Sequence, residues 1–265
     1  MTNAPVPSTA LETAGVAAAR RGPASPPEAA GSPTFEQRRR LRPRLWDTDW
    51  LVLRGMHEAI SAHAARLARP GASILDFGCG ARPYASLFTA RGATYLGADL
   101  DGDPDVAIRP DGTLEVADRS ADVVVSFQVL EHVRDLDTYL GEAHRVLKDD
   151  GQLLLSTHGT WLYHPHPEDH RRWTREGLLA ELASRGFETT DCIPVVGPLA
   201  WTTMVRLTCA AVAIRRIPVV GPALAGALAV VMNLKAALED RITPAWVTKD
   251  NACVYVTLSR RARTP

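Results

Sequence analysis

Cysteine and net charge are both scarce in this sequence. Only four of its 265 residues are cysteine, and no two of them form a CxxC pair. This argues against a disulfide scaffold or a zinc ribbon and fits a reducing cytoplasm. Thirty Lys and Arg against thirty Asp and Glu give a formal charge of zero, so no global basic field attracts nucleic acid. With 46% hydrophobic residues, the chain can still bury a substantial core without metals or disulfides.

Large apolar side chains are almost absent from residues 1–33, which are rich in Ala, Pro, Ser and Gly. Such a segment cannot bury enough surface to offset its conformational entropy, so the composition predicts a disordered tail. Because residues 1–45 carry seven Arg against three Glu, we expect a basic, disordered tail over 1–45 and a folded domain over 46–265. The arginines between 38 and 44 are interpreted as a solvated linker, with contact to phosphate or anionic lipid as the alternative. No secretory signal is expected, since the arginines follow the apolar stretch 11–19 instead of preceding it.

From residue 47 onward, short β-branched runs alternate with segments of helical length. The predicted helices are 48–67, 84–90, 136–147 and 174–184, and the predicted strands are 73–77, 94–98, 106–108, 121–127, 152–156 and 187–193. Strands separated by helix-sized segments predict βαβ units and therefore an α/β fold, with a parallel sheet between two layers of helices.

The first chemical motif is ILDFGCGARPY at residues 74–84, where the first strand turns into a helix. Open α/β sheets bind ligands at this carboxyl edge, and Gly78 and Gly80 allow a ligand close to the backbone. The third glycine of a dinucleotide-binding GxGxxG falls on Pro83, so that fingerprint is absent. Asp76 would repel phosphate but attract a cationic ligand, and the ammonium and sulfonium of S-adenosylmethionine suit it. The alternative is a tight turn that binds nothing.

Acidic residues at the next two strand ends favour a nucleoside ligand. Asp99 ends the second strand about twenty positions beyond the glycines, where a carboxylate accepts both ribose hydroxyls. Asp111 follows the third strand, where it could accept from an adenine amino group.

Four motifs in order resemble the class I S-adenosylmethionine-dependent methyltransferases of the type-11 group. They are DFGCG (76–80), GAD (97–99), DVVVSFQVLEHV (122–133) and RVLKDDGQLLLST (145–157). The resemblance covers roughly residues 50–193. It implies a Rossmann-like, seven-stranded, mostly parallel sheet with helices on both faces and an antiparallel last strand at 252–259. Residues 197–250 then form a helical insertion before that strand.

The resemblance also implies which residues bind S-adenosylmethionine as the cofactor. Asp76, Gly78 and Gly80, with Cys79 between the glycines, would hold the methionine end; Asp99 would bind the ribose, Leu100 would pack on adenine, Asp111 would meet its amino group, and Gln128 would sit beside the methionine portion. Two departures from the family pattern are the segment 82–83 in place of a third small residue and Asp150 in place of the first glycine of a Gly-Gly pair. The CG-x-x-PY variant resembles a subgroup associated with cell-surface polysaccharide and lipid-linked sugar pathways.

Methyl transfer needs alignment, a dry site and, for many oxygen or nitrogen acceptors, a base. The candidate catalytic bases are His158, just past the fifth strand, and His132, just past the fourth. His158 is expected to face the crevice, whereas packing or capping is the competing interpretation of His132.

The segment 161–174 is rich in histidine and could form a lid over the substrate. His164, His166 and His170 with Asp169 offer metal ligands, but their spacing is loose, and we predict no metal. The pattern Pro167, Asp169, Arg172, Trp173, Thr174 resembles one that recurs in the family, and a structural Asp169–Arg172 clamp is the favoured interpretation.

Two apolar stretches, 199–214 and 217–232, occupy the insertion. Neither is a convincing membrane span, because spanning takes about 20 apolar residues and Pro218 and Pro222 shorten the second. One interpretation is a pair of buried helices that roof the acceptor pocket. The other is an apolar surface over 197–232 that contacts a membrane or a lipid-linked acceptor, helped by Arg215 and Arg216.

The sequence therefore predicts a cytoplasmic S-adenosylmethionine-dependent methyltransferase, membrane-associated if the second interpretation of the insertion holds. The expected acceptor is a small molecule, a glycan or a lipid-linked molecule, methylated at oxygen. A catalytically silent S-adenosylmethionine-binding regulatory protein is the alternative. A nucleic-acid substrate is disfavoured, since residues 46–258 carry a net charge of −7 once the +4 of residues 1–45 and the three C-terminal Arg are subtracted from zero.

Overall fold

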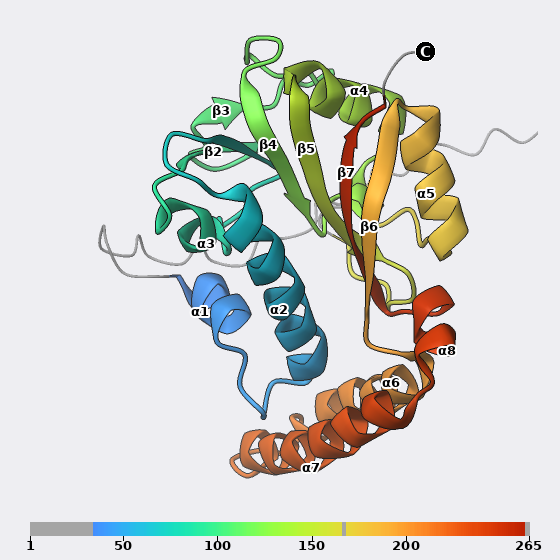
Figure 1. Cartoon of the computed structure of the whole chain (residues 1–265). Helices are drawn as coiled ribbons and strands as arrows, with labels where there is room; N and C mark the ends of the chain where they lie inside the picture. Colours follow the sequence, from blue (N-terminus) through green and yellow to red (C-terminus); the bar gives the residue numbers. More distant parts are fainter. Residues whose placement is uncertain (1–33, 166–167, 263–265) are drawn as a thin grey trace, which may run out of the picture. The chain divides into compact units, whose positions relative to one another are not determined.

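The computed structural model describes residues 34–165 and 168–262. The predicted disordered tail over 1–33 lies outside these residues. The sheet has seven strands in the order β3-β2-β1-β4-β5-β7-β6 (Figure 1). Their bounds are β1 Ser73–Phe77, β2 Thr94–Asp99, β3 Val106–Ala107, β4 Ala121–Phe127, β5 Leu147–His158, β6 Phe187–Val195 and β7 Val254–Arg261.

The strand directions match the predicted class. β1 pairs in parallel with β2 and β4, and β4 pairs in parallel with β5. β7 runs antiparallel between β5 and β6, which confirms the expected antiparallel last strand. Since a parallel sheet is covered on both faces, its central strands are almost continuously apolar, as ADVVVSF is in β4.

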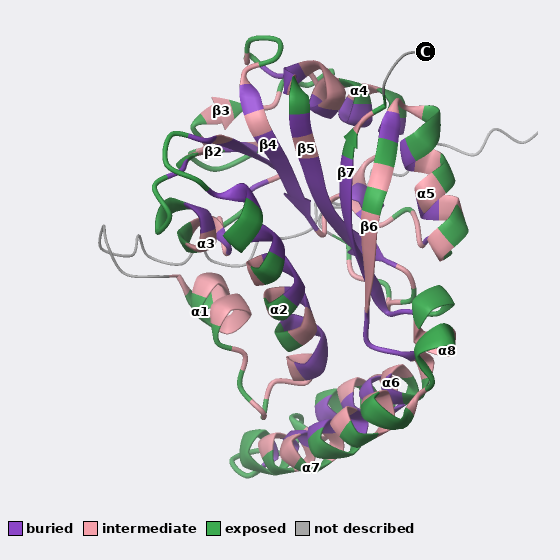
Figure 2. Cartoon of the chain, viewed as in Figure 1, coloured by how far each residue is buried: buried purple, intermediate pink, exposed green. Residues whose placement is uncertain are grey.

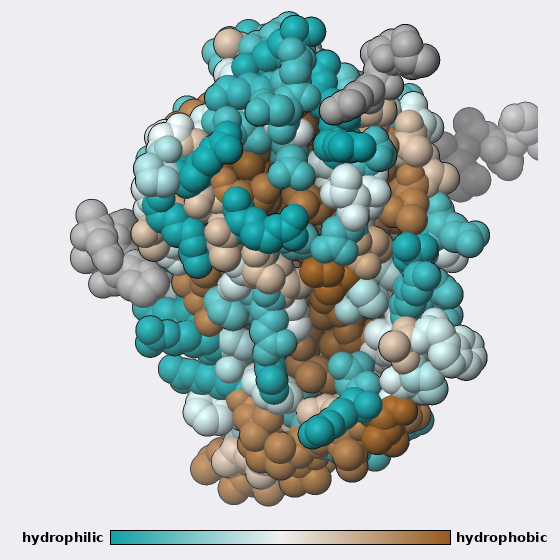
Figure 3. Space-filling view, in the orientation of Figure 1, coloured by the Kyte–Doolittle hydropathy of each residue, from teal (hydrophilic) through white to brown (hydrophobic). Residues whose placement is uncertain are grey.

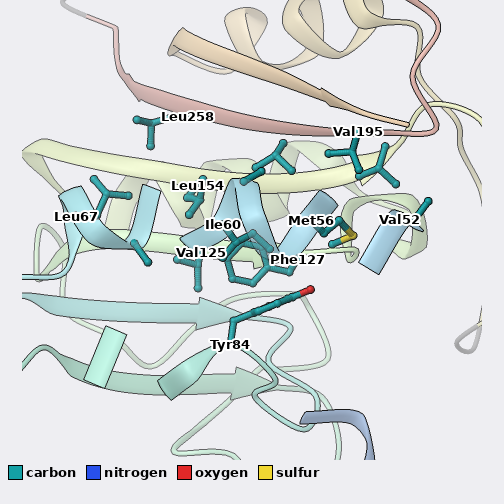
Figure 4. Close-up of a cluster of buried hydrophobic side chains, with 14 of the residues drawn as sticks. Val52, Met56, Ile60, Leu67, Tyr84, Val125, Phe127, Leu154, Val195 and Leu258 are labelled. Carbon is teal, nitrogen blue, oxygen red and sulfur yellow. The ribbon is translucent and has the colours of Figure 1, made fainter. Parts of the chain in front are cut away.

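Successive side chains of the central strands feed two separate cores. Leu154 of β5 belongs to the core on one face, while Leu153 and Leu155 belong to the core on the other. On the first face α2 (Trp50–Leu67) lays Met56 and Ile60 against the sheet (Figure 4). On the second face lie α4 (Leu136–Val146) and α5 (Arg175–Ser184). The remaining sheet helices are short, namely α3 (Ala85–Thr89) and the 3-10 turn η1 (Leu130–His132). Figure 2 shows the central strands buried and the outer helix faces exposed.

The folded part begins earlier than predicted, because α1 (Phe35–Leu41) is a helix. Thr34 accepts from the Gln37 amide and Gln37 reaches back to the Thr34 amide, which together make a capping box. Arg39 then pairs with the Asp49 carboxylate at 2.5 Å. The prediction of disorder up to residue 45 is therefore wrong for 34–45, since part of the arginine run is paired rather than merely solvated.

The insertion forms α6 (Pro198–Ile214), α7 (Gly221–Ile242) and α8 (Ala245–Asp250). Pro222 stands in the first turn of α7, where its missing N–H costs nothing, so it starts the helix instead of shortening it. The helix continues ten residues beyond the apolar stretch predicted to end at Met232. The two long helices pack side by side as a hairpin, which we call the α6–α7 hairpin (Figure 1).

Candidate active site

A cavity of about 930 Å³ lies at the carboxyl ends of β1, β2, β4 and β5. This is the edge where open α/β sheets bind ligands. All ten residues proposed from the sequence line it: Asp76, Gly78, Cys79, Gly80, Asp99, Leu100, Asp111, Gln128, His132 and His158. The structure brings them together, while their individual roles stay predictions.

The turn after β1 exposes backbone to the cavity. Gly78 and Gly80 have φ of +83° and +48°, a region that side chains rarely adopt. A Cβ on Gly78 would lie 2.7 Å from Val129, whereas a Cβ on Gly80 would meet no atom within 4 Å. The space beside Gly80 is therefore open to a ligand. Burial raises the pKa of the neighbouring Cys79 thiol to about 11, so this thiol is neutral and packs at the turn.

Asp76 is a buried carboxyl at the end of β1. Its Oδ2 accepts a hydrogen bond of 2.5 Å from the Tyr95 hydroxyl. Burial raises the pKa of Asp76 to about 7, and the charge of Asp99 adds to the shift. A cationic group in the cavity would favour the ionised form of this carboxyl. Tyr95 could not be identified from the sequence. Its hydroxyl reaches Asp76 only because β2 pairs with β1 so that Tyr95 lies opposite Ile74.

Asp99, Leu100 and Asp111 line the cavity at the ends of β2 and β3. The Asp99 carboxylate accepts hydrogen bonds from the Gly80 amide at 2.6 Å and from the Leu100 amide at 2.7 Å, so it lies next to the glycine turn. Leu100 is 64% exposed on the rim. Asp111 Oδ1 accepts from the amide and the hydroxyl of Thr113, which gives this carboxylate a structural role as well.

At the β5 side of the cavity, the lining residue His158 pairs with a buried carboxylate. His158 Nδ1 lies 2.9 Å from Glu131 Oε1, and the Thr157 hydroxyl donates to Glu131 Oε2 at 2.8 Å. Burial alone would raise the pKa of Glu131, but contacts with His158 and Thr157 outweigh it and hold that pKa below its ordinary value. The imidazole of His158 stacks on Trp161 with 5.2 Å between ring centroids. Glu131 is not among the residues predicted from the sequence, although its place beside His132, just past the end of β4, is a usable signal.

Two more histidines border this pair. His132 Nε2 lies 3.9 Å from Glu131 Oε1, and its Nδ1 contacts the Glu168 carbonyl oxygen at 2.5 Å. The His164 ring lies 4.8 Å from the His158 ring. Ligand atoms of Glu131, His158 and His164 fall within 4.8 Å of one another, so these three could hold a metal ion.

That group differs from the metal alternative considered from the sequence. The Asp169 carboxylate is bound by Arg172 through two hydrogen bonds, of 2.5 and 2.7 Å, which confirms the predicted clamp. His170 Nε2 contacts Glu168 Oε2 instead. His166 and Pro167 lie outside the described residues.

The expected roof over the pocket is wrong. Among the residues that the structure describes, none from α6, α7 or α8 lines the cavity. The wall comes instead from α1, through residues such as Arg39 and Arg40, and from the first turns of α2. The insertion contacts the cavity lining through Trp201, which stacks on Trp161 with 5.0 Å between ring centroids.

Comparison with known proteins agrees with this geometry. Residues 52–192, over half of the chain, match the sequence model of a methyltransferase domain family. A probable S-adenosylmethionine-dependent methyltransferase of Mycolicibacterium smegmatis is 31% identical over 156 residues, which cover 52% of this chain and 60% of the relative. A ubiquinone biosynthesis O-methyltransferase of Azorhizobium caulinodans is 30% identical over 172 residues, covering 51% of this chain and 66% of the relative. The matches thus span less than two thirds of either relative.

A solved structure shares the fold at low identity. It is the 1,6-didemethyltoxoflavin-N1-methyltransferase of Burkholderia thailandensis, whose structure contains S-adenosylhomocysteine. The TM-score is 0.51 at 20% identity, and the match covers 79% of each chain. Together with the matched domain and the 3-2-1-4-5-7-6 sheet, these findings show that the chain belongs to the class I S-adenosylmethionine-dependent methyltransferases.

Proposed function

We propose that this chain transfers the methyl group of S-adenosylmethionine to an oxygen atom of its acceptor. The observation that carries the proposal is the buried Glu131–His158 pair. His158 lines the same cavity as Asp76 and Asp99, and Glu131 lies behind it, outside the cavity lining. A base placed opposite a donor site is the arrangement that methylation of a hydroxyl requires.

The residues near the glycine turn fit the donor. The buried Asp76 carboxyl suits an ammonium group, the open space at Gly80 admits a ligand against the backbone, and Asp99 offers a carboxylate to ribose hydroxyls. When bound, S-adenosylmethionine supplies an electrophilic methyl group on a cationic sulfur. The neighbouring carboxylates stabilise positive charge in a partly dry cavity.

His158 would take the acceptor's proton. With Nδ1 beside Glu131, the nitrogen left for the acceptor hydroxyl is Nε2. As that proton moved to Nε2, the acceptor oxygen would take the methyl group that bound S-adenosylmethionine would supply, and the sulfur would keep the electron pair of the broken carbon–sulfur bond. Glu131 would orient the imidazole and stabilise the imidazolium that forms, as the buried carboxylate does for the histidine of a catalytic triad. His132, the second candidate base, is less favoured, because its Nδ1 already contacts the Glu168 carbonyl oxygen and its Nε2 is turned towards Glu131.

The acceptor class is part of the proposal: a small molecule, a glycan or a lipid-linked molecule, and no nucleic acid. Similarity to ubiquinone biosynthesis O-methyltransferases supports an oxygen acceptor. The net negative charge of residues 46–258 speaks against a nucleic acid. We place the protein in the cytoplasm, with a peripheral membrane contact through residues 197–232.

Labelled methyl donor incubated with the chain and fractionated cell extract tests the function, with the labelled product identified by mass. We expect one labelled class of product, lost in His158→Asn with donor affinity kept. His170→Asn, outside the cavity, is the matched control and should transfer normally. Donor binding without transfer to any fraction would favour the silent regulatory protein instead.

A further inference from the structure

The α6–α7 hairpin exposes large apolar side chains to solvent and buries small side chains between its two helices. The residues of α7 that are buried are small or polar: Gly221, Ala225, Ala229, Asn233 and Ala236. Five large apolar residues of the same helix are each more than half exposed, namely Leu224, Val231, Leu234, Leu238 and Ile242, whereas Leu228, Val230 and Met232 are half-buried. A helix that packs on a water-soluble core shows the reverse distribution. Small residues between helices and large apolar residues outside them are typical of helices in lipid.

The tip of the hairpin extends this apolar surface. Val219 is 95% exposed, and Ile217 and Val220 beside it are also exposed. Arg215 and Arg216, both exposed, precede the tip directly. In Figure 3 the hairpin forms a broad hydrophobic area at the lower end of the view.

The exposure belongs to an ordered and anchored element. The hairpin has its own small core, formed by Leu207, Ala211, Ala225 and Ala229. At its base, buried Asn233 donates to the carbonyls of Leu45 and Asp47, and Asp240 accepts from the Gly197 amide. The half of the hairpin beyond Asn233, residues 205–232, therefore projects from a fixed base.

We propose that this distal half of the hairpin docks onto the surface of a lipid bilayer with anionic headgroups. Its exposed apolar residues lie on the tip, on the outer face of α7 and, through Val212, on α6. A bilayer can cover all of these sides at once, whereas a second copy of the chain would cover one face. The two arginines next to the apolar tip match anionic headgroups in charge.

The contact is interfacial. By length and composition α7 could cross a membrane, and only 28% of its most apolar 18-residue stretch is buried in the protein. Its uncharged part, residues 221–234, is however about 21 Å long, against a hydrocarbon core of about 30 Å. Beyond it Lys235 and Glu239 bond to each other and to Thr203 of α6, so this end stays with the protein.

Docking would bring the cavity near the membrane. The hairpin lies beyond the carboxyl end of β4, which is the end of the sheet that carries the cavity (Figure 1). A lipid-linked acceptor would then reach His158 from the bilayer surface. This consequence rests on the proposed function, whereas the docking itself does not.

Flotation of the full chain with vesicles tests the docking. We expect it to float with phosphatidylcholine vesicles that contain phosphatidylglycerol, and less with phosphatidylcholine alone. Val219→Asp should lower the bound fraction at least about fivefold, because it places a carboxylate at the apolar tip. Val219 has φ of +64°, which strains a β-branched residue and which aspartate tolerates better, so the variant should melt no lower than the wild type.

Ile242→Asp is the matched control, since Ile242 is 62% exposed on the same helix but at its anchored end. It should float like the wild type. Arg215→Glu combined with Arg216→Glu should remove the preference for anionic vesicles. A chain that floats with neither vesicle, or a dimer in sedimentation that Val219→Asp dissociates, would overturn the proposal. Neither result depends on whether the chain transfers methyl groups.

Discussion

Asp76 holds a proton that a cationic ligand would displace. With its pKa raised to about 7 by burial, this carboxyl is mostly protonated in the free chain below neutral pH. An ammonium group beside it lowers that pKa, so binding releases a proton. We expect donor affinity to rise with pH between 5.5 and about 7.5 and then to level off. Titration calorimetry in two buffers of different ionisation enthalpy measures the released proton directly.

The same shift has a consequence for stability. The folded chain binds this proton up to about pH 7, whereas an unfolded aspartate loses it near pH 4. Unfolding therefore becomes easier, as far as this group is concerned, while pH rises through that window. Asp76→Asn should gain stability relative to the wild type as pH rises from about 4 to 7, while binding the donor poorly. A constant difference between the two melting curves would contradict the assignment.

Asp99 lies where both ribose hydroxyls could be held, and its side chain is only partly buried. Asp99→Ala should weaken donor binding about a hundredfold, because two charge-assisted hydrogen bonds are lost. The fold should survive, since the remaining contacts of Asp99 are two loop amides. Asp101→Ala, on the exposed loop that follows, is the control and should bind normally in calorimetry.

The residues missed from the sequence share one feature. Glu131 and Tyr95 contact partners distant in the chain, His158 and Asp76. Tyr95 reaches Asp76 through the pairing of β2 with β1, and Glu131, in the turn η1 after β4, reaches His158 because β4 pairs with β5. Asp76, Asp99 and His158 could be placed because each ends a strand, and strand ends meet at one edge. The sequence thus predicts which residues reach the cavity, but not which side chains pair within it.

Helix α1 illustrates the same limit for an element. Its arginines predict a solvated linker, whereas the T-x-x-Q capping box that begins at Thr34 indicates the start of a helix. The structure has the helix. The helix is held by Arg39, whose guanidinium faces the largely buried Asp49 carboxylate. Amino-acid composition does not show specific ion pairs such as Arg39–Asp49, so it predicts the start of the folded part too late in the chain.

Two truncations separate the tail from this helix. Removing residues 1–33 should leave melting temperature and donor affinity unchanged, since that composition contributes no core. Removing residues 1–45 should lower the melting temperature by roughly 4–8 °C, because Asp49 loses its partner and Asn233 loses the Leu45 carbonyl. Equal melting of both truncated chains in calorimetry would show that α1 contributes nothing.

At the scale of the whole molecule, the sheet was predictable and the insertion was only partly so. The strands β1 and β4 are local apolar runs, so the sequence pattern alone placed them at their observed bounds. The insertion was recognised as helical, but hydrophobicity cannot tell whether an apolar face turns inward or outward. The direction of the apolar face depends on where the small residues lie, and in α7 the small residues form the buried face.

The insertion can therefore be separated from the methyltransferase fold. The strands on either side of it already meet: Val195 pairs with Val254, and the Cys253 amide donates to the Val196 carbonyl at 2.8 Å. A short Asn-Gly turn in place of residues 197–252 should close these strands as a β-hairpin. Because none of the described residues of α6–α8 lines the cavity, we expect unchanged donor affinity in calorimetry.

Stability should fall in this variant, because Ala200, Met204 and Ala236 pack against the main core. Losing their burial should cost roughly 10 °C in melting temperature. Vesicle binding should disappear with the hairpin, while a chain that keeps floating would place the membrane contact elsewhere. A folded variant that no longer binds the donor would mean that the insertion supports the cavity through Trp201 and Trp161 after all.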